Sequence, residues 1–197
     1  TPYDNLSAGF FATDNVTFYA TDGLSNSTTQ TYSFNVLGGN DPPVAQGSLN
    51  LGNFTEDNAS SMNLNGSDVD QDNLTYTLVS EPKYGAISNF DSQSGSLTFT
   101  PYDNLSSGFQ AQDNFSFLVT DNHSENSTIA TVSFSVSGVN DLPAVTELTY
   151  VMQLGETESD NLSFDPVDAF DNHTFALVGN ANFGTVVLDN ASTGAFT

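Results

Sequence analysis

The sequence predicts an all-β protein built from tandem β-sandwich repeats arranged end to end. Helix formers are scarce among its 197 residues, and no window places apolar side chains at i, i+3, i+4 and i+7. Several short stretches instead alternate apolar and polar residues, as half-buried strands do. The chain also repeats itself at an interval of about 99 residues, which is the size of one β-sandwich domain.

The opening stretch of the chain, TPYDNLSAGF at 1–10, returns as TPYDNLSSGF at 100–109. The match continues along the chain, with one residue inserted between its second and third segments. The further matches are TDNVTFYATD at 13–22 with QDNFSFLVTD at 112–121, TYSFNVLGGNDPP at 31–43 with TVSFSVSGVNDLP at 131–143, DNLTYTLVSEPKYGAI at 72–87 with DNHTFALVGNANFGTV at 171–186, and SGSLTFT at 94–100 with TGAFT at 193–197.

The repeat is out of phase with the ends of the sequence. Residues 1–42 correspond to the C-terminal part of one repeat, residues 43–142 to a complete repeat, and residues 143–197 to the N-terminal part of another. Half a sandwich has no second face to pack against and leaves strand edges open. Two arrangements follow: a window on a long covalent array, or head-to-tail donor-strand complementation, in which 1–42 of one copy completes 143–197 of the next.

The alternating stretches assign inward-facing side chains to equivalent strands in the repeats. Because the aromatic residues lie in phase with the strand period, we expect them in the core rather than on a ligand-stacking platform. The inward sets are Val16, Phe18 and Ala20 with Phe115, Phe117 and Val119; Tyr32, Phe34 and Val36 with Val132, Phe134 and Val136; and Leu74, Tyr76 and Leu78 with Phe175 and Leu177.

The charge of the chain is strongly one-sided: 24 acidic residues accompany one basic residue, Lys83, for a formal net charge of −23. Such a charge argues against nucleic acid and anionic membranes as partners, and no apolar run approaches the ~18 residues of a membrane span. The absence of cysteine excludes disulfides and zinc–thiolate sites. Crowded carboxylates repel one another, which predicts a neutralising cation; the alternative is a solvated acidic surface suited to high salt.

Three motifs of the middle repeat together resemble the bacterial cadherin-like tandem repeats of long secreted adhesins. They are an Asn-Asp-x-Pro junction, the acidic loop SDVDQD followed by NLTY, and the strand FSFLVTD. The resemblance covers essentially the whole chain and implies seven-stranded Greek-key sandwiches of immunoglobulin-like type at the cell surface. In cadherin-like proteins calcium binds between successive domains and stiffens the rod, and calcium prefers six to eight oxygen ligands.

Matching the family's motifs to this sequence implies calcium ligands at two junctions between repeats. Departures from the family pattern, such as DPVDAFD in place of SDVDQD, lead us to expect about one or two ions per junction. The alternative is that these Asp and Asn side chains only cap turns. The expected ligands are Asp4, Asn40, Asp41, Asp68, Asp70 and Asp121 at the first junction, and Glu56, Asp103, Asn140, Asp141 and Asp168 at the second.

Asn-x-Ser/Thr sequons are more frequent than composition explains, since 22 Asn residues would give roughly five or six by chance. Several recur at equivalent positions of the repeats, and Asn alternating with inward residues should point outward. N-linked glycans are therefore expected partners, with composition alone as the alternative. The acceptors are Asn5, Asn15, Asn26, Asn53, Asn58, Asn65, Asn73, Asn104, Asn114, Asn122, Asn126, Asn161, Asn172 and Asn190.

No catalytic arrangement is evident in the sequence. His123 and His173 both lie in Asp-Asn-His loops without a nearby nucleophile motif, and Asp68 and Asp70 are spaced for a shared cation rather than for glycosidase chemistry. Two non-catalytic functions remain: a structural segment of an extracellular fibre or adhesin, and a module that binds a glycan or a surface. Because the aromatics are in phase with the core, the sequence favours the structural role.

Overall fold

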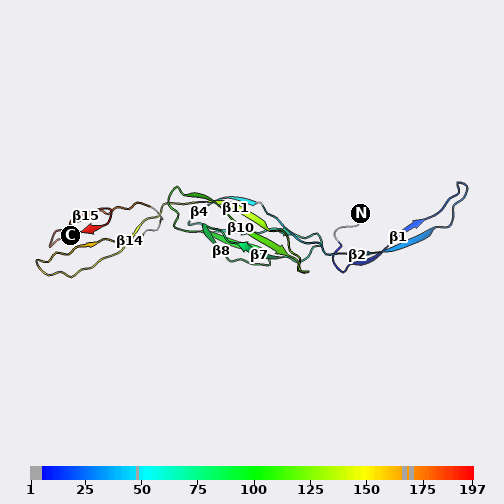
Figure 1. The fold of residues 1–197 in the computed structure, drawn as a ribbon, viewed down its shortest axis with the longest axis horizontal. Helices are drawn as coiled ribbons and strands as arrows, with labels where there is room; N and C mark the ends of the chain where they lie inside the picture. The colour runs from blue at the N-terminus through cyan, green and yellow to red at the C-terminus, as the bar shows by residue number, and fades with distance from the viewer. Residues whose placement is uncertain (1–5, 48, 166–167, 169–170) are drawn as a thin grey trace. The chain divides into compact units, whose positions relative to one another are not determined.

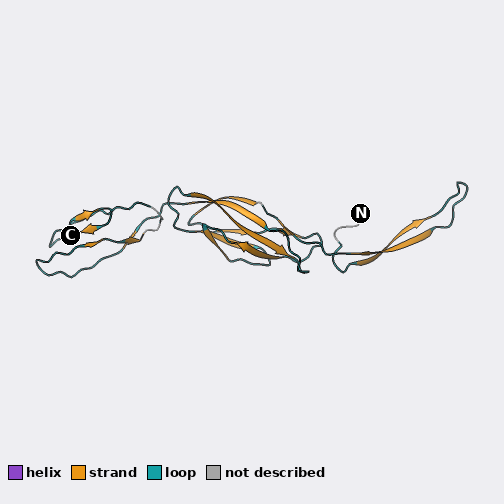
Figure 2. Cartoon of the chain, in the orientation of Figure 1, coloured by secondary structure: helices purple, strands orange, loops and turns teal. Residues whose placement is uncertain are grey.

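The computed structural model describes residues 6–47, 49–165, 168 and 171–197. Asp4 and Asn5, expected to bind calcium and a glycan, lie outside these residues. The described residues form strands and irregular segments without a helix, which confirms the all-β prediction (Figure 2). The strands are β1 (Phe11–Phe18), β2 (Gln30–Leu37), β3 (Val44–Ala45), β4 (Leu49–Thr55), β5 (Ser60–Asn63), β6 (Gly66–Ser67), β7 (Thr75–Ser80), β8 (Gly85–Ser88), β9 (Ser96–Pro101), β10 (Gln110–Thr120), β11 (Ala130–Ser137), β12 (Ala144–Val145), β13 (Asp160–Asn161), β14 (Phe164–Asp165), β15 (Leu188–Asn190) and β16 (Ala195–Phe196).

The chain divides into two compact units. The first contains Thr1–Leu51, Ser60–Phe99 and Asp113–Phe134, and the second contains Gly52–Ala59, Thr100–Gln112 and Ser135–Thr197. No helix able to span a membrane occurs in the described part of the chain.

The middle of the chain forms the one domain-sized region that is evident among the described residues. A four-stranded sheet has the order β4-β11-β10-β7, and a three-stranded sheet has the order β5-β9-β8. β3 and β6 form a further short pair at the start of the region. The β10 hairpin partner β11 thus lies between β10 and β4, while the other edge of β10 pairs with β7.

The core of this region consists of the alternating residues that the sequence indicated. Phe115, Phe117 and Phe134 are 0 % exposed, and the rings of Phe99 and Phe134 lie 4.7 Å apart between centroids. Burying each such side chain stabilises the fold by about 1.5–3 kcal/mol. The inward prediction is confirmed for β10 and β11, where every second side chain is removed from water.

The N-terminal part of the chain is an antiparallel hairpin of β1 and β2, shown side by side in Figure 1. Its register pairs Val16 with Tyr32 and Ala12 with Val36, which gathers the expected inward side chains on one face. The expected burial is not realised, because Phe18 is 54 % and Tyr32 62 % exposed. Alternation orients a side chain to one face of a sheet, but burial needs a second layer over that face.

The C-terminal part carries short strand pairs that match those of the middle region. β12 pairs with β14, and β13, β16 and β15 form a three-stranded sheet. The segment at 171–179, which corresponds in sequence to the region around β7, forms no strand, and Leu177 is 43 % exposed rather than buried. The repeat bounds at 42/43 and 142/143 stay predictions.

Candidate metal centres

Glu56 is the central residue of the first acidic cluster, which we call the Glu56 cluster and which consists of Glu56, Asp141 and Asp168. Glu56 directly follows β4 and is 0 % exposed. Its carboxylate accepts the backbone N–H of Leu105 at 2.9 Å and that of Val139. These bonds fix the carboxylate between the loop after β9 and the segment that leaves β11.

Asp141 and Asp168 complete this cluster from the segments flanking β12 and β14. The backbone N–H of Asp141 donates to Asp168 Oδ2 at 2.9 Å, which places the two residues side by side. One ligand oxygen of each of the three cluster members lies within 4.8 Å of the others. Asp141 Oδ2 and Asp168 Oδ1 are buried and accept no hydrogen bond.

Electrostatics in the Glu56 cluster oppose full ionisation without a cation. Burial raises the pKa of Glu56 above its usual value, against the lowering by the N–H groups of Val139 and Leu105. The charges of Asp141 and Asp168 then add to the rise. Burial is also the main cause that raises the pKa of Asp141, and the charges of nearby acids, among them Asp168, raise it further. A divalent cation would reverse this repulsion.

The second acidic cluster, the Asp68 cluster, consists of Asp68, Asp72 and Asp121 and lies in the first unit. The loop between β6 and β7 folds back on itself, since the N–H groups of Asp70 and Asp72 donate to Asp68 Oδ1 at 2.8 and 3.3 Å. This leaves Asp68 Oδ2 buried without a partner. Gln71, between them, has a positive φ of 65°, a conformation that few non-glycine residues adopt.

The Asn-Asp junction at 40–41 lies against this loop. Asn40 Nδ2 donates to Asp121 Oδ2 at 2.9 Å, and the N–H of Asp41 donates to Asp70 Oδ2 at 2.9 Å. Burial raises the pKa of Asp121, but hydrogen bonds from Asn40 and from the N–H groups of Glu125 and His123 outweigh it and lower the pKa overall. Asn40 Oδ1 and Asp70 Oδ1 remain buried without partners.

The unpartnered atoms point to a common cause. In the described part of the chain, all buried side-chain oxygen or nitrogen atoms that lack a hydrogen bond belong to expected calcium ligands: Asn40, Asp68, Asp70, Asp141 and Asp168. Each such group costs about 1–3 kcal/mol unless something binds it. All five atoms are oxygens, the ligand type that calcium prefers, so the residues present fit this ion.

The structure brings some expected ligands together and leaves others apart. Asp41 and Asp103 are exposed and belong to neither cluster, although the charge of Asp103 contributes to the raised pKa of Asp141. Asn140 is also exposed. Asp72 was missed by the sequence analysis. Its signal was its place as the last acid of the SDVDQD run, one strand period beyond Asp70.

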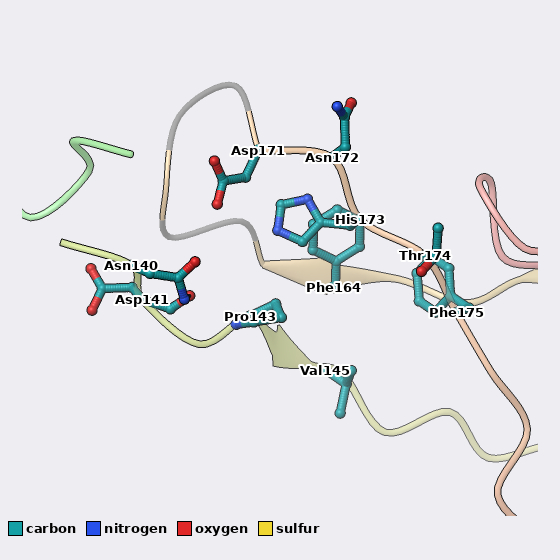
Figure 3. Close-up of a pocket in the computed structure, with 10 residues that line it drawn as sticks. All are labelled: Asn140, Asp141, Pro143, Val145, Phe164, Asp171, Asn172, His173, Thr174 and Phe175. Carbon is teal, nitrogen blue, oxygen red and sulfur yellow. The ribbon is translucent and has the colours of Figure 1, made fainter. Parts of the chain in front are cut away.

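A pocket of about 270 Å³ opens beside the second junction (Figure 3). It extends from Asn140 and Asp141 to the aromatic residues of the C-terminal part. The ring of Phe164 lies 4.3 Å from that of His173 and 5.6 Å from that of Phe175. Both apolar and polar side chains line the pocket, among them Val145, His173 and Thr174.

The sequon asparagines of the described residues are all exposed, as an accessible acceptor must be. Some of their amides already have protein partners: Asn53 Nδ2 donates to Ser137 Oγ at 2.8 Å, and Asn65 Nδ2 donates to Gln46 Oε1 at 2.9 Å. Exposure is compatible with glycosylation at these positions and does not by itself select the occupied ones.

Residues 40–138 match the family model of the bacterial cadherin-like domain. The chain belongs to this family. The match begins at the Asn-Asp junction and ends just after β11, so it covers the domain-sized region described above. No curated protein matches the chain.

Solved structures with a similar arrangement include cadherin ectodomains and a polysaccharide hydrolase. Human CDH23 EC21-23 is 19 % identical with a TM-score of 0.49, over 94 % of this chain and 63 % of that one. Drosophila N-cadherin EC1-4 is 14 % identical with a TM-score of 0.43, over 99 % and 51 %. An endo-fucoidan hydrolase of glycoside hydrolase family 107 is 22 % identical with a TM-score of 0.40, over 70 % of this chain and 20 % of the hydrolase. At these TM-scores the likeness says nothing about activity or partners.

Proposed function

We propose that this chain is a non-catalytic structural segment of a long extracellular fibre or adhesin at the cell surface, stiffened by calcium at its inter-repeat junctions. Membership of the bacterial cadherin-like family supports an adhesive or structural extracellular module. The observation that carries the calcium part is the set of buried, unpartnered oxygens at the two Asn-Asp junctions. A cation would satisfy these atoms and neutralise the carboxylates that repel one another.

At the second junction, Glu56, Asp141 and Asp168 would hold the ion. Glu56 keeps both oxygens oriented through the N–H groups of Leu105 and Val139. Asp141 and Asp168 each present one oxygen without another partner. An ion bound to all three would tie the end of β4 to the segments around β12 and β14, which lie on the far side of the junction in sequence.

At the first junction, the Asp68 cluster together with Asn40 and Asp70 would hold calcium. Asp121 follows β10 directly, while Asp68 lies after β6, so an ion would link two separate parts of the same repeat. Asp41 takes part through its N–H bond to Asp70. The imidazole of His123 also contacts this cluster, with its Nδ1 2.9 Å from Asp72 Oδ2, so a bound calcium ion would share Asp72 with it.

Two further elements belong to the proposal. N-linked glycans on the exposed sequons would coat the protein and shield strand edges from lateral association. Head-to-tail assembly would complete the partial repeats at 1–42 and 143–197, either within a longer covalent array or by donor-strand complementation between copies. Deglycosylation followed by denatured mass measurement tests the first element, because an unchanged mass would contradict it.

A glycan- or surface-binding module is the second candidate function, because the β1–β2 hairpin exposes aromatic side chains such as Phe18 and Tyr32. Such a row resembles a sugar-stacking platform. However, the equivalent side chains of the middle repeat, Phe117 and Val132, are buried in its core. We therefore assign the exposed row to repeat completion, and binding to a panel of polysaccharides would argue for the second function instead.

Calcium titration tests the main proposal. We expect calcium to raise the thermal unfolding midpoint and EDTA to reverse the effect. Asp168→Asn removes one ligand charge but keeps an acceptor for the Asp141 N–H, and should weaken calcium binding about tenfold or more. Glu147→Gln, an exposed acid in the same unit, is the matched control and should leave the affinity unchanged. Absence of calcium binding at millimolar concentration would overturn the proposal.

A further inference from the structure

The β1–β2 hairpin presents an apolar face that none of the described residues covers. Its register places Val16 opposite Tyr32, with Phe18 and Phe34 on the same face. These four side chains are 43–62 % exposed. Along most of its length the opposite face carries polar residues such as Thr13, Thr17 and Asn35, which suit water, while Phe11 and Leu37 form its last pair. The hairpin is therefore amphipathic but lacks the layer that its apolar face requires.

The equivalent hairpin in the middle region shows what such a face packs against. β10 and β11 lie between β7 and β4 in their sheet, and their equivalent side chains are fully buried. The two hairpins share their local hydrogen bonds. The N–H of Ser27 donates to Ala20 O at 2.8 Å, and that of Ser127 donates to Val119 O at 2.8 Å. The hairpin at 6–37 thus has the local structure of the β10–β11 hairpin but forms only a two-stranded sheet among the described residues.

The C-terminal part has the complementary deficiency. It repeats the small strand pairs of the middle region. The N–H of Leu162 donates to Gly194 O at 2.9 Å, just as the N–H of Leu64 donates to Gly95 O at 2.9 Å in the middle region. Its counterpart of β7, at 174–179, forms no strand, and Val178 is 103 % exposed. No described residue of this part supplies counterparts of β10 and β11.

We propose that the β1–β2 hairpin of one copy inserts into the C-terminal part of a second copy, with residues 17–21, which continue from the end of β1, adding to residues 174–179. This inference deepens the head-to-tail element of the proposed function and rests on it. Transferring the register of β10 and β7, in which Leu118 pairs with Thr77, places Tyr19 of one copy opposite Ala176 of the other. The occupant of the apolar face is therefore a second copy of this chain.

The shapes of the two surfaces agree with this pairing. In the middle region Gly66 lies so close to Val119 that an added Cβ would be 3.1 Å from the Val119 methyl group. The β12–β14 pair places Phe164 at the position of Gly66, where it lines the pocket in Figure 3. The hairpin has the smaller Ala20 where β10 has Val119. The larger residue on one surface thus meets a smaller one on the other.

The polar groups agree as well. Asp113 of β10 is 5 % exposed and accepts the N–H groups of Lys83 at 2.9 Å and Tyr84 at 2.8 Å. Its counterpart in the hairpin is Asp14, which accepts only the N–H of the adjacent Asn15 among the described residues. The counterparts of Lys83 and Tyr84 are Asn182 and Phe183, with Phe183 103 % exposed. Asp14 of one copy would accept these two N–H groups of the next.

Disulfide trapping tests the inference cleanly, because the native chain has no cysteine. Two variants of the 197-residue chain, Tyr19→Cys and Ala176→Cys, are mixed and oxidised. We expect a disulfide-linked dimer that contains one chain of each kind, since cross-strand neighbours lie within disulfide reach. Leu24→Cys replaces Tyr19→Cys in the matched control, because Leu24 is 94 % exposed and lies at the tip of the hairpin, between the bridged residues Thr21 and Asn26. A control that links as efficiently overturns the inference.

The double variant Tyr19→Cys/Ala176→Cys shows whether the inserted hairpin comes from a second copy or from the same chain. A ladder of linked multimers supports insertion between copies. A linked monomer of altered mobility would show closure within one chain and overturn the proposal, as would the absence of any link at millimolar concentration. Calcium binding by the same preparations is measured alongside, so failure of the hairpin inference is separable from failure of the calcium proposal.

A size exchange provides the second test. Ala20→Val should weaken association about tenfold by overpacking against Phe164. Combining it with Phe164→Gly recreates the Val119–Gly66 pair and should restore association. If Ala20→Val has no effect on association, or if Phe164→Gly fails to rescue it, the proposed packing is wrong.

Discussion

The carboxylate of Glu56 accepts the backbone N–H of Leu105 at 2.9 Å, across 49 residues of sequence, while fully buried. The same carboxylate accepts the N–H of Val139. An acidic side chain therefore joins three segments that meet at the second junction. Its position explains why a charged group is kept in a site where burial and other carboxylates oppose its ionisation.

Glu56→Ala should destabilise the calcium-free protein by about 2–5 kcal/mol, because it leaves the buried N–H of Leu105 and the part-buried N–H of Val139 without an acceptor. Glu56→Gln retains one acceptor oxygen and loses the unfavourable charge, so its effect without calcium should be much smaller. Chemical denaturation in EDTA measures both. Equal destabilisation by the two variants would mean that the charge, not the hydrogen bonds, maintains the site.

Without calcium, the stability of the fold should increase on mild acidification, because two carboxyl groups have raised pKa values in the folded state. Burial raises the pKa of Glu56 and of Asp141, so the folded state binds protons more tightly than the unfolded state at these groups. In EDTA these groups destabilise the fold at neutral pH, and stability should rise as pH falls through their folded pKa, until the unfolded values near 4 are reached.

Calcium should reverse this trend, because the bound ion favours the ionised carboxylates and is released on acidification. Thermal unfolding midpoints between pH 7 and 4, with calcium and with EDTA, make the comparison. Glu56→Gln should flatten the EDTA profile. A wild-type profile in EDTA that falls steadily with acidification would contradict the prediction, since the carboxylates with lowered pKa, such as Asp160, would then dominate.

Asp113 and Asp14 form a matched pair for measuring a buried hydrogen bond. Asp113→Ala should destabilise the chain by about 2–4 kcal/mol, since the N–H groups of Lys83 and Tyr84 lose their acceptor. Asp14→Ala at the equivalent position should change the stability of the dilute chain by less than about 0.5 kcal/mol. Urea titrations at low protein concentration test this, and a large effect of Asp14→Ala would mean that Asp14 is already covered.

The sequence predicted the fold where local pattern and tertiary packing agree. Alternation placed Phe115, Phe117 and Phe134 correctly in the core, since both sheets of the middle region are present to cover them. The same pattern predicted burial of Phe18 and Tyr32, which are exposed. Period-2 alternation reports the face that a side chain occupies, but it contains no information about whether another layer is present.

The candidate site was only partly foreseeable for a similar reason. Motif spacing named Asp141 and Asp168, which the fold brings together, but it also named Asp103, which lies outside the clusters. Asp72 was missed although it ends the SDVDQD run, because its place in the cluster depends on how the loop closes around Asp68. The two N–H groups that hold Glu56 come from distant loops, and no local pattern identifies such backbone partners. As metal ligands, all of these residues stay a prediction.

Gly138 offers a last test of how the second junction is held in place. A Cβ added at this position would lie 2.1 Å from the carbonyl oxygen of Leu105, and the same clash recurs at Gly38 with Leu6 at 2.2 Å. Gly138→Ala therefore forces apart the loop and the segment whose N–H groups both donate to Glu56. We expect a destabilisation of about 1–3 kcal/mol, as for overpacking in a core, together with weaker calcium binding.

Gly179→Ala is the matched control, because nothing lies within 4 Å of an added Cβ there. It should be neutral in both thermal unfolding and calcium titration. If Gly138→Ala lowered stability but left calcium affinity unchanged, the ion would not depend on the Leu105 and Val139 contacts. The Glu56 cluster would then not be where calcium binds, and the Asp68 cluster would remain as the candidate.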